Sequence, residues 1–158
     1  MKFGIIGSGM IARFHAKAIE AMPGSELCSI CSRNAVSSGA LSQEFGCQAF
    51  TDLDVFLADT ELEIVTIATP SGAHLEPTIA AARAGKHVIC EKPLEITTER
   101  VDQMAAAGKE YGVTISGIFN RRFNLGLAAL KRAVDEGRFG QISLADAYIK
   151  WYRDQDTA

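Results

Sequence analysis

The amino-acid sequence predicts an α/β fold, a doubly wound parallel sheet followed by the truncated start of a second α/β domain. Two observations carry this prediction. Short apolar segments alternate with segments of helical periodicity from residue 3 to residue 119, and short loops connect them. Residues 63–69 are nearly all apolar or β-branched, as in a strand that is buried on both faces of a parallel sheet.

The expected elements follow one another in a regular β-α order. Pro23 and Gly24 end the first helix, and Asn34 is placed to cap the second. Pro77 suits the first turn of a later helix, which ends at Gly85. The expected strands are residues 3–6, 26–32, 47–50, 63–69, 87–90 and 113–119. Besides the helix that begins near Pro77, the expected helices are residues 10–21, 35–45, 52–58 and 97–111.

The pattern changes near residue 123. Residues 124–136 form an amphipathic helix that ends at Gly137, and residues 141–152 alternate between apolar and polar side chains, as a half-exposed strand does. Because a single strand cannot form a sheet, we expect residues 1–122 to form one domain and residues 123–158 to begin a second one. The unpaired edge of such a strand is suited to association with another copy of the chain.

A glycine turn lies between the first strand and the first helix. Gly7, Gly9 and Ala12 have the spacing of the dinucleotide-binding fingerprint, in which alanine is allowed at the last position. Gly7 permits a tight turn, Gly9 lacks a Cβ that would block a pyrophosphate, and Ala12 lets the helix pack closely on the strand. Free N–H groups of the first helical turn then face the phosphates. The residues expected to bind the dinucleotide here are Gly7, Ser8, Gly9, Met10, Ile11 and Ala12.

Composition argues against several other classes of function. The 158 residues are 47% hydrophobic and 22% charged, as in globular proteins, and the net charge of −3 offers no basic field for nucleic acid or a membrane surface. The sequence has no apolar run of membrane-spanning length and no signal peptide, so a cytoplasmic protein is expected.

Four cysteines are present, and Cys28 and Cys31 form a C-x-x-C pattern. Both lie in an expected strand, where residues three apart point to opposite faces of the sheet. No second pair completes a zinc site, and histidines are few. The cysteines are therefore interpreted as reduced apolar side chains, and no metal is expected.

Small and polar residues collect where the expected strands end. Ser32-Arg33, Thr69-Pro70, Glu91-Lys92-Pro93 and Asn120-Arg121 each follow a strand, as the glycine turn does. In a doubly wound sheet, ligands bind in the crevice beyond the carboxyl ends of the strands. These segments therefore predict one shared site.

The motifs that characterise the chain are Gly7-x-Gly9-x-x-Ala12, Thr69-Pro70-x-x-x-His74, Glu91-Lys92-Pro93 and Asn120-Arg121-Arg122-Phe123. Together they resemble those of the Gfo/Idh/MocA oxidoreductases, the family of glucose–fructose oxidoreductase and inositol dehydrogenase. The resemblance covers the whole chain. It implies an N-terminal Rossmann domain that binds NAD(P) and a larger C-terminal domain through which family members assemble. It also implies hydride transfer to or from a sugar, cyclitol or related polyol, and a homo-oligomer in the full-length form.

The resemblance implies roles for residues near the reacting carbon. Lys92 is expected beside the nicotinamide as the catalytic residue, where its ammonium would hydrogen-bond the substrate oxygen and help to move its proton. Glu91 is expected to contact the cofactor or to orient Lys92. In the family, Pro93 follows a cis peptide bond that turns the lysine into the cleft; the sequence alone does not give the isomer.

Further residues are expected along the cofactor. The resemblance places Thr69 and Pro70 beside the nicotinamide ribose and Asn120 near the nicotinamide. For His74, a hydrogen bond to the cofactor or a contact at the helix start is favoured over the role of catalytic base.

The end of the second strand indicates which dinucleotide is preferred. NAD enzymes generally carry Asp or Glu there to bind the ribose 2′-OH, whereas this chain has Ser32 and Arg33. A hydroxyl and a guanidinium suit a 2′-phosphate, which a carboxylate would repel. NADP is therefore the preferred cofactor, with NAD as the alternative. The other role open to Arg33 is to stack on the adenine of either cofactor.

Two other functions remain open. The chain could belong to a non-catalytic dinucleotide-sensing or regulatory protein, or to an NAD-dependent glycoside hydrolase of the same family. A cofactor released at each turnover favours the dehydrogenase, and one retained through purification favours the hydrolase. The domain that completes catalysis in the family lies outside these 158 residues, so the piece is able to bind a cofactor without turning over a substrate.

Overall fold

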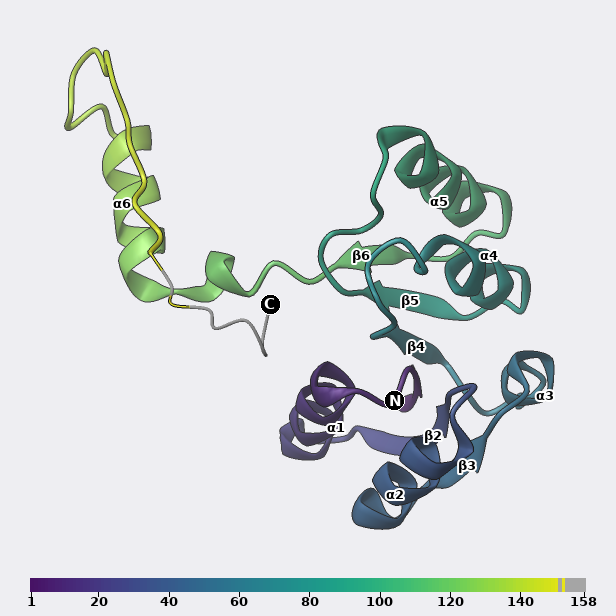
Figure 1. Ribbon diagram of the computed structural model, residues 1–158. Helices are drawn as coiled ribbons and strands as arrows, with labels where there is room; N and C mark the ends of the chain where they lie inside the picture. Colours follow the sequence, from purple (N-terminus) through teal and green to yellow (C-terminus); the bar gives the residue numbers. More distant parts are fainter. Residues whose placement is uncertain (151, 153–158) are drawn as a thin grey trace. The chain divides into compact units, whose positions relative to one another are not determined.

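The computed structural model describes residues 1–150 and 152 (Figure 1). The chain divides into two compact units, Met1–Phe119 and Asn120–Ala158. This division lies close to the boundary expected between the two domains.

The first unit is built on a parallel sheet of six strands in the order β3-β2-β1-β4-β5-β6, as the sequence predicts. The order reverses direction between β1 and β4, which are neighbours in the sheet, so the carboxyl ends of β1, β2 and β4 meet there. The strands are β1 (Lys2–Ile6), β2 (Glu26–Cys31), β3 (Gln48–Phe50), β4 (Ile64–Ile67), β5 (His87–Cys90) and β6 (Ile115–Gly117).

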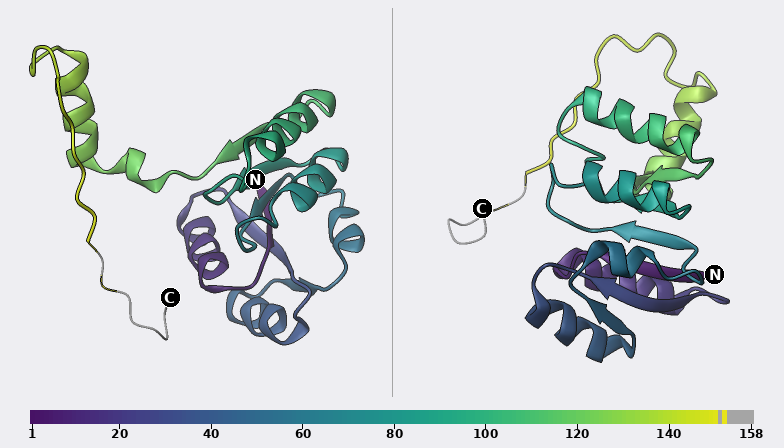
Figure 2. Two further views of the ribbon diagram at one scale, coloured as in Figure 1. Left: turned by 45° about the horizontal axis from the view of Figure 1, so that its top comes forward. Right: turned by 90° about the vertical axis from the view of Figure 1, so that its right-hand side faces the viewer.

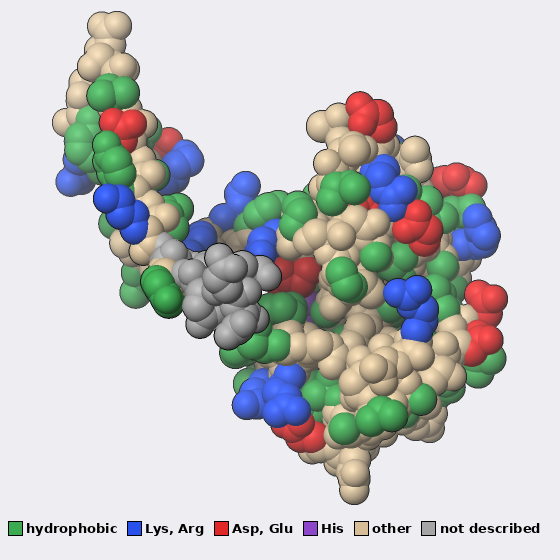
Figure 3. All heavy atoms as spheres, in the orientation of Figure 1, with side chains coloured by type: hydrophobic (Ala, Val, Ile, Leu, Met, Phe, Trp, Pro, Cys, Tyr) green, Lys and Arg blue, Asp and Glu red, His purple; other side chains and the backbone are tan. Residues whose placement is uncertain are grey.

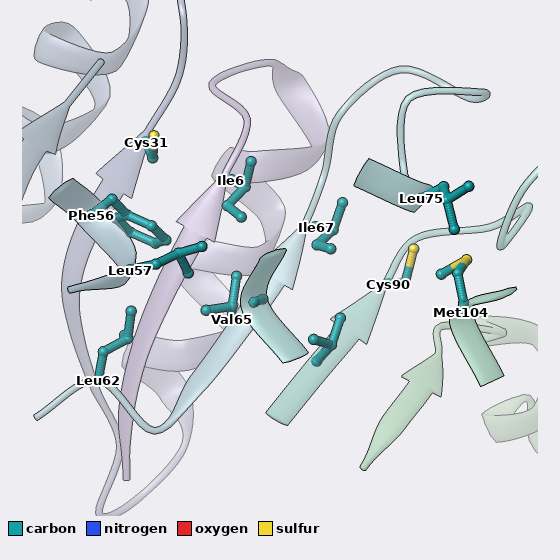
Figure 4. Packing of buried hydrophobic residues seen from close by; sticks show 12 residues of the cluster. Ile6, Cys31, Phe56, Leu57, Leu62, Val65, Ile67, Leu75, Cys90 and Met104 are labelled. Atoms are coloured by element: carbon teal, nitrogen blue, oxygen red, sulfur yellow. The ribbon is translucent and has the colours of Figure 1, made fainter. Parts of the chain in front are cut away.

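Helices cover both faces of the sheet (Figure 2). One core cluster combines strand residues with side chains of α1 and α2, and the other combines them with side chains of α3, α4 and α5 (Figure 4). The helices of this unit are α1 (Met10–Ala21), α2 (Ala35–Phe45), α3 (Leu53–Leu57), α4 (Leu75–Arg83) and α5 (Thr98–Glu110).

Side-chain caps explain where several of these helices begin. The Asn34 side chain accepts hydrogen bonds from the backbone of Val36 and Ser37 and starts α2, and Gly46 ends that helix with a left-handed conformation. Asp52 and Thr97 cap α3 and α5 in the same way. The helix over residues 35–45 is confirmed at both ends, whereas the strands expected over 63–69 and 113–119 are shorter than predicted.

The second unit contains a 3₁₀ helix, Asn120–Phe123, and helix α6, Leu125–Asp135, which the Asn124 side chain caps. The strand expected over residues 141–152 is wrong for residues 141–150 and 152, which form no strand. A strand needs a hydrogen-bonded neighbour, and the described residues of this unit contain no second strand. Trp151, which belonged to the expected alternation, lies outside the described residues.

Surface features of the described residues are mixed in character. On the face in Figure 3, basic, acidic and hydrophobic side chains are interspersed over the first unit. Within the described part of the chain, none of the helices has both the length and the apolar character required to cross a lipid bilayer.

The core on the α3 side predicts a specific loss of stability. Phe56 is fully buried, whereas its neighbour Val55 on the same helix is 57% exposed. We expect Phe56→Ala to lower the free energy of unfolding by about 3–5 kcal/mol because it leaves a cavity. Urea denaturation would measure this, with Val55→Ala as the matched control, expected to change stability by less than about 0.5 kcal/mol. Equal effects of the two substitutions would contradict the packing described.

Candidate functional site

A cavity of about 900 Å³ lies beyond the carboxyl ends of β1, β2 and β4. It is the place at which a doubly wound sheet binds ligands. The sequence-predicted site residues that line it are Gly7, Ser8, Gly9, Met10, Ile11, Ser32, Arg33, Thr69 and Pro70. The structure thus brings together nine predicted residues from three strand ends that are far apart in the sequence.

The turn after β1 packs tightly against the loop after β4. Gly7 has φ +120°, and its N–H donates to the Cys31 carbonyl at 2.8 Å. A Cβ on Gly7 would lie 2.5 Å from the Ala68 carbonyl oxygen, which is closer than real Cβ contacts. The turn therefore requires glycine at this position, both for its backbone conformation and for the close approach.

Gly9 has a different role, because it faces open space. It is the N-cap residue of α1, and a Cβ built on it would have no heavy atom within 4 Å. No side chain caps this helix, and no acidic residue lies in its first turn. The first N–H groups of a helix have no intrahelical partner, so those of α1 are available to an anion in the cavity. Helices α2, α3, α5 and α6, by contrast, each have a capping side chain.

Three serine hydroxyls meet beside this helix end. The Ser8 hydroxyl donates to Ser32 at 2.9 Å and lies 2.6 Å from the Ser37 hydroxyl. The N–H of Asn34 donates to the Ser32 hydroxyl at 3.3 Å. All four residues line the cavity, so they present a neutral, hydrogen-bonding wall at the end of β2.

Of the two charged residues that line the cavity, Glu76 has an ion-pair partner among the described residues and Arg33 does not. The Glu76 carboxylate accepts a hydrogen bond from Arg100 at 2.8 Å. Its pKa is lower than usual because of a backbone hydrogen bond at the start of α4 and the bond from Arg100. Arg33 lines the same cavity, and its guanidinium has no ion pair among the described residues. The free charge at this site is therefore positive.

Cys31 also lines the cavity, at the end of β2. Burial raises the pKa of its thiol to about 11, so the thiol is neutral at ordinary pH. Cys31 and Cys28 are both free, as are the other cysteines. Among the described residues, no group of three or more His, Cys, Asp or Glu side chains is arranged to hold a metal ion.

The loop after β4 is closed by its own hydrogen bonds. The Thr69 hydroxyl donates to the Ala73 carbonyl at 2.8 Å. His74 is fully buried and does not line the cavity. It is the N-cap residue of α4, although its side chain makes no capping hydrogen bond. Its Nε2 lies 2.9 Å from the Thr69 carbonyl oxygen and its Nδ1 2.9 Å from that of Pro93. His74 therefore joins the loop after β4 to the loop after β5. This geometry does not favour a role for His74 as a base that acts on a ligand in the cavity.

Glu91 and Lys92 leave β5 beside the cavity-lining loops but do not line the cavity themselves. The peptide bond between Lys92 and Pro93 is cis. One Glu91 oxygen accepts from the Lys92 backbone N–H at 3.0 Å, and the other lies 3.1 Å from Nε2 of His15. The Lys92 side chain is exposed and makes no hydrogen bond or ion pair with another described residue.

Sequence reasoning missed several residues of this region, and three of them make polar contacts that shape it. Ser37 and Asn34 line the cavity through the hydroxyl cluster, and His15 contacts Glu91. The signal for Asn34 and Ser37 was their position directly after the Ser32-Arg33 strand end. His15 lies on the same helix face as Ala12 and Ala16, and a polar residue on a buried face was the signal that it needs partners. Ala12 is fully buried, as the close packing of helix and strand requires.

Asn120 belongs to the second unit, so its contact with a cofactor stays a prediction.

Comparisons with known proteins agree with this geometry. The model of the family described as "Oxidoreductase family, NAD-binding Rossmann fold" (Gfo/Idh/MocA) matches residues 1–119. An inositol 2-dehydrogenase of Rhizobium meliloti is 31% identical over 91% of this chain and 43% of its own length.

Solved structures give the same result. The WlbA dehydrogenase of Bordetella pertussis, in complex with NADH and UDP-GlcNAcA, matches with a TM-score of 0.85 and 34% identity over 89% of this chain and 41% of its own. A scyllo-inositol dehydrogenase of Lactobacillus casei with bound NAD(H) and scyllo-inositol matches with a TM-score of 0.82 and 29% identity over 90% and 43%. The chain thus spans less than half the length of these relatives. It belongs to the Gfo/Idh/MocA oxidoreductase family and contains that family's NAD-binding Rossmann fold.

Gly7 provides a test of the close packing at the turn. We expect Gly7→Ala to lower the free energy of unfolding by at least about 2 kcal/mol, because it adds a clash with the Ala68 carbonyl to the backbone strain. Gly24→Ala is the matched control, since Gly24 has φ +77° but open space around it, and it should cost only about 1 kcal/mol. Denaturant unfolding measures both; an equal cost would mean that the close approach is absent.

Proposed function

We propose that this chain is the cofactor-binding part of an NAD(P)-dependent oxidoreductase that transfers a hydride between nicotinamide and a carbinol or carbonyl carbon of a sugar, cyclitol or related polyol. The observation that carries the proposal is the uncapped start of α1, which faces a cavity across a glycine with open space in place of a Cβ. The class of substrate is supported by the family to which the chain belongs and by two relatives whose names include inositol.

The residues at the cavity fit a dinucleotide. The N–H groups at the start of α1 would hold the pyrophosphate, and the absence of a Cβ on Gly9 would let it approach the backbone. Thr69 and Pro70 would flank the part of the dinucleotide that extends toward β5. The nicotinamide ring, when bound, supplies or accepts the hydride.

Lys92 is the residue proposed to act on the substrate. Its exposed ammonium is available as a hydrogen-bond donor at the carboxyl end of β5. It would bind the substrate oxygen, stabilise negative charge there and hold or release that oxygen's proton. In this proposal, residues 123–158 begin the domain that supplies the remaining substrate contacts.

NADP is the proposed preference. Arg33 is free of ion pairs within the described chain, and Ser32, Asn34 and Ser37 line the same cavity with polar groups. A guanidinium and hydroxyl groups bind a phosphate well, and β2 ends without a carboxylate that would repel the phosphate. The solved relatives above hold NADH or NAD(H), so the preference rests on these residues and needs its own test.

The first experiment is calorimetric titration of the chain with NADPH and NADH. We expect Arg33→Ala to weaken NADPH binding by roughly ten- to a hundredfold, since it removes a charged hydrogen bond, and to leave NADH binding within about twofold. Arg13→Ala is the control, because Arg13 pairs with Glu44 and does not line the cavity. Equal weakening of both cofactors would reduce Arg33 to a contact with the adenine.

Gly9 tests where the dinucleotide binds. The backbone of Gly9 (φ −83°, ψ −173°) is accessible to alanine, and its Cβ would touch no protein atom. We expect Gly9→Ala to lower the free energy of unfolding by no more than about 1 kcal/mol, the cost of alanine at an N-cap, but to weaken NADPH binding at least about tenfold, since the new methyl group occupies the pyrophosphate site. Undiminished binding by this variant would place the dinucleotide elsewhere.

A further inference from the structure

His15 is a polar residue on an otherwise apolar helix face. It lies on α1 with Ala12, Ala16 and Ile19, which pack against the sheet, and only 8% of its surface is exposed. A buried imidazole is unfavourable unless its nitrogens are hydrogen-bonded. An apolar side chain would fill the same space without this requirement.

Both ring nitrogens have partners. Nδ1 lies 3.0 Å from the Thr66 hydroxyl oxygen on β4, and Nε2 lies 3.1 Å from Oε1 of Glu91. A carboxylate accepts hydrogen bonds, so the tautomer that fits this contact has its hydrogen on Nε2 and donates a hydrogen bond to Glu91. The Thr66 hydroxyl then completes the other side of the ring. The ring is thus held between the centre of the sheet and the loop that follows β5.

The Glu91 carboxylate, which His15 contacts through one oxygen, also contacts the backbone of Lys92 through the other. Its Oε2 accepts the Lys92 backbone N–H at 3.0 Å, while its own N–H donates to the Ile67 carbonyl at 3.0 Å. The Glu91 side chain is only 15% exposed, so its carboxylate has little water to replace a lost partner. With the His15 bond in place, one oxygen faces the helix and the other faces the Lys92 N–H.

We propose that His15 is a positioning residue for Lys92, acting through the Glu91 carboxylate. The catalytic meaning of this role rests on the function proposed above for Lys92. The same helix would then serve both ends of the site: its first turn faces the cavity, and its second turn orients the backbone from which the Lys92 side chain extends. His15 itself does not touch the reacting atoms.

The experiment follows the Lys92 amide by NMR in the ¹⁵N-labelled chain without any dinucleotide. His15→Leu removes the donor and keeps the site filled. We expect it to speed exchange of the Lys92 amide with water by about tenfold, the effect of one lost hydrogen bond, and to move its proton resonance upfield. His15→Gln keeps an N–H donor within reach of Glu91 and should bring the exchange rate back to within about threefold of wild type.

Two further variants separate positioning from simple core packing. Ile19→Val removes one methyl group from the same helix face and so loosens the packing of α1 without touching Glu91. It should leave the exchange rate of the Lys92 amide unchanged. In a Glu91→Ala background, His15→Leu should have no additional effect on Lys92, since the link between them is already removed. Glu91 lies in the loop after β5 and outside both core clusters, so Glu91→Ala alone, which breaks the same link, keeps the test available if His15→Leu does not fold.

The proposal is overturned if His15→Leu leaves the Lys92 amide as in wild type. It is equally overturned if Ile19→Val produces the same change, if His15→Gln fails to restore the rate, or if His15→Leu still acts after Glu91→Ala. Because no cofactor is present, these outcomes are independent of the titrations. A chain that binds no dinucleotide would defeat the proposed function while leaving the link from His15 to Lys92 intact.

Discussion

The structure depends on the close approach of the turn after β1 to the start of the loop after β4. At Gly7 there is no room for a Cβ, because it would lie 2.5 Å from the Ala68 carbonyl oxygen. This approach brings the first turn of α1 to the edge of the cavity, and it sets the helix close enough to the sheet for His15 to reach Thr66. A larger residue at position 7 would move the first turn of the helix and the histidine together.

The strand order converts this local packing into a site. Because β1 lies between β2 and β4, the helix end is flanked by the hydroxyl cluster of Ser8, Ser32 and Ser37 on one side and by the Thr69 loop on the other. The next loop, at Glu91, is held by hydrogen bonds to His15 and to the backbone of Ile67. His74 is buried between the Thr69 and Pro93 carbonyl oxygens and connects the loop after β4 to the loop after β5.

Local signals explain what the sequence could predict. Asn34 and Gly46 mark the ends of α2 because caps act on adjacent residues. The glycine turn and the β-α order predict the sheet and nine of the residues that line the cavity. Partnerships over long separations have no such signal: His15 meets partners 51 and 76 residues away. The strand expected over residues 141–152 is wrong over its described residues for a related reason. Alternation shows which side chains a strand would bury, but it does not supply the neighbouring strand that stabilises it.

The central claim is that the start of α1 binds the phosphates of a dinucleotide, and amide chemical shifts of the ¹⁵N-labelled chain during titration with NADPH test it most directly. The account predicts that the largest shifts occur at Ser8, Gly9, Met10 and Ile11, followed by Ser32, Arg33 and Ser37, which line the same cavity. Saturable shifts confined to other parts of the chain, with residues 7–12 unchanged at full occupancy, would contradict it.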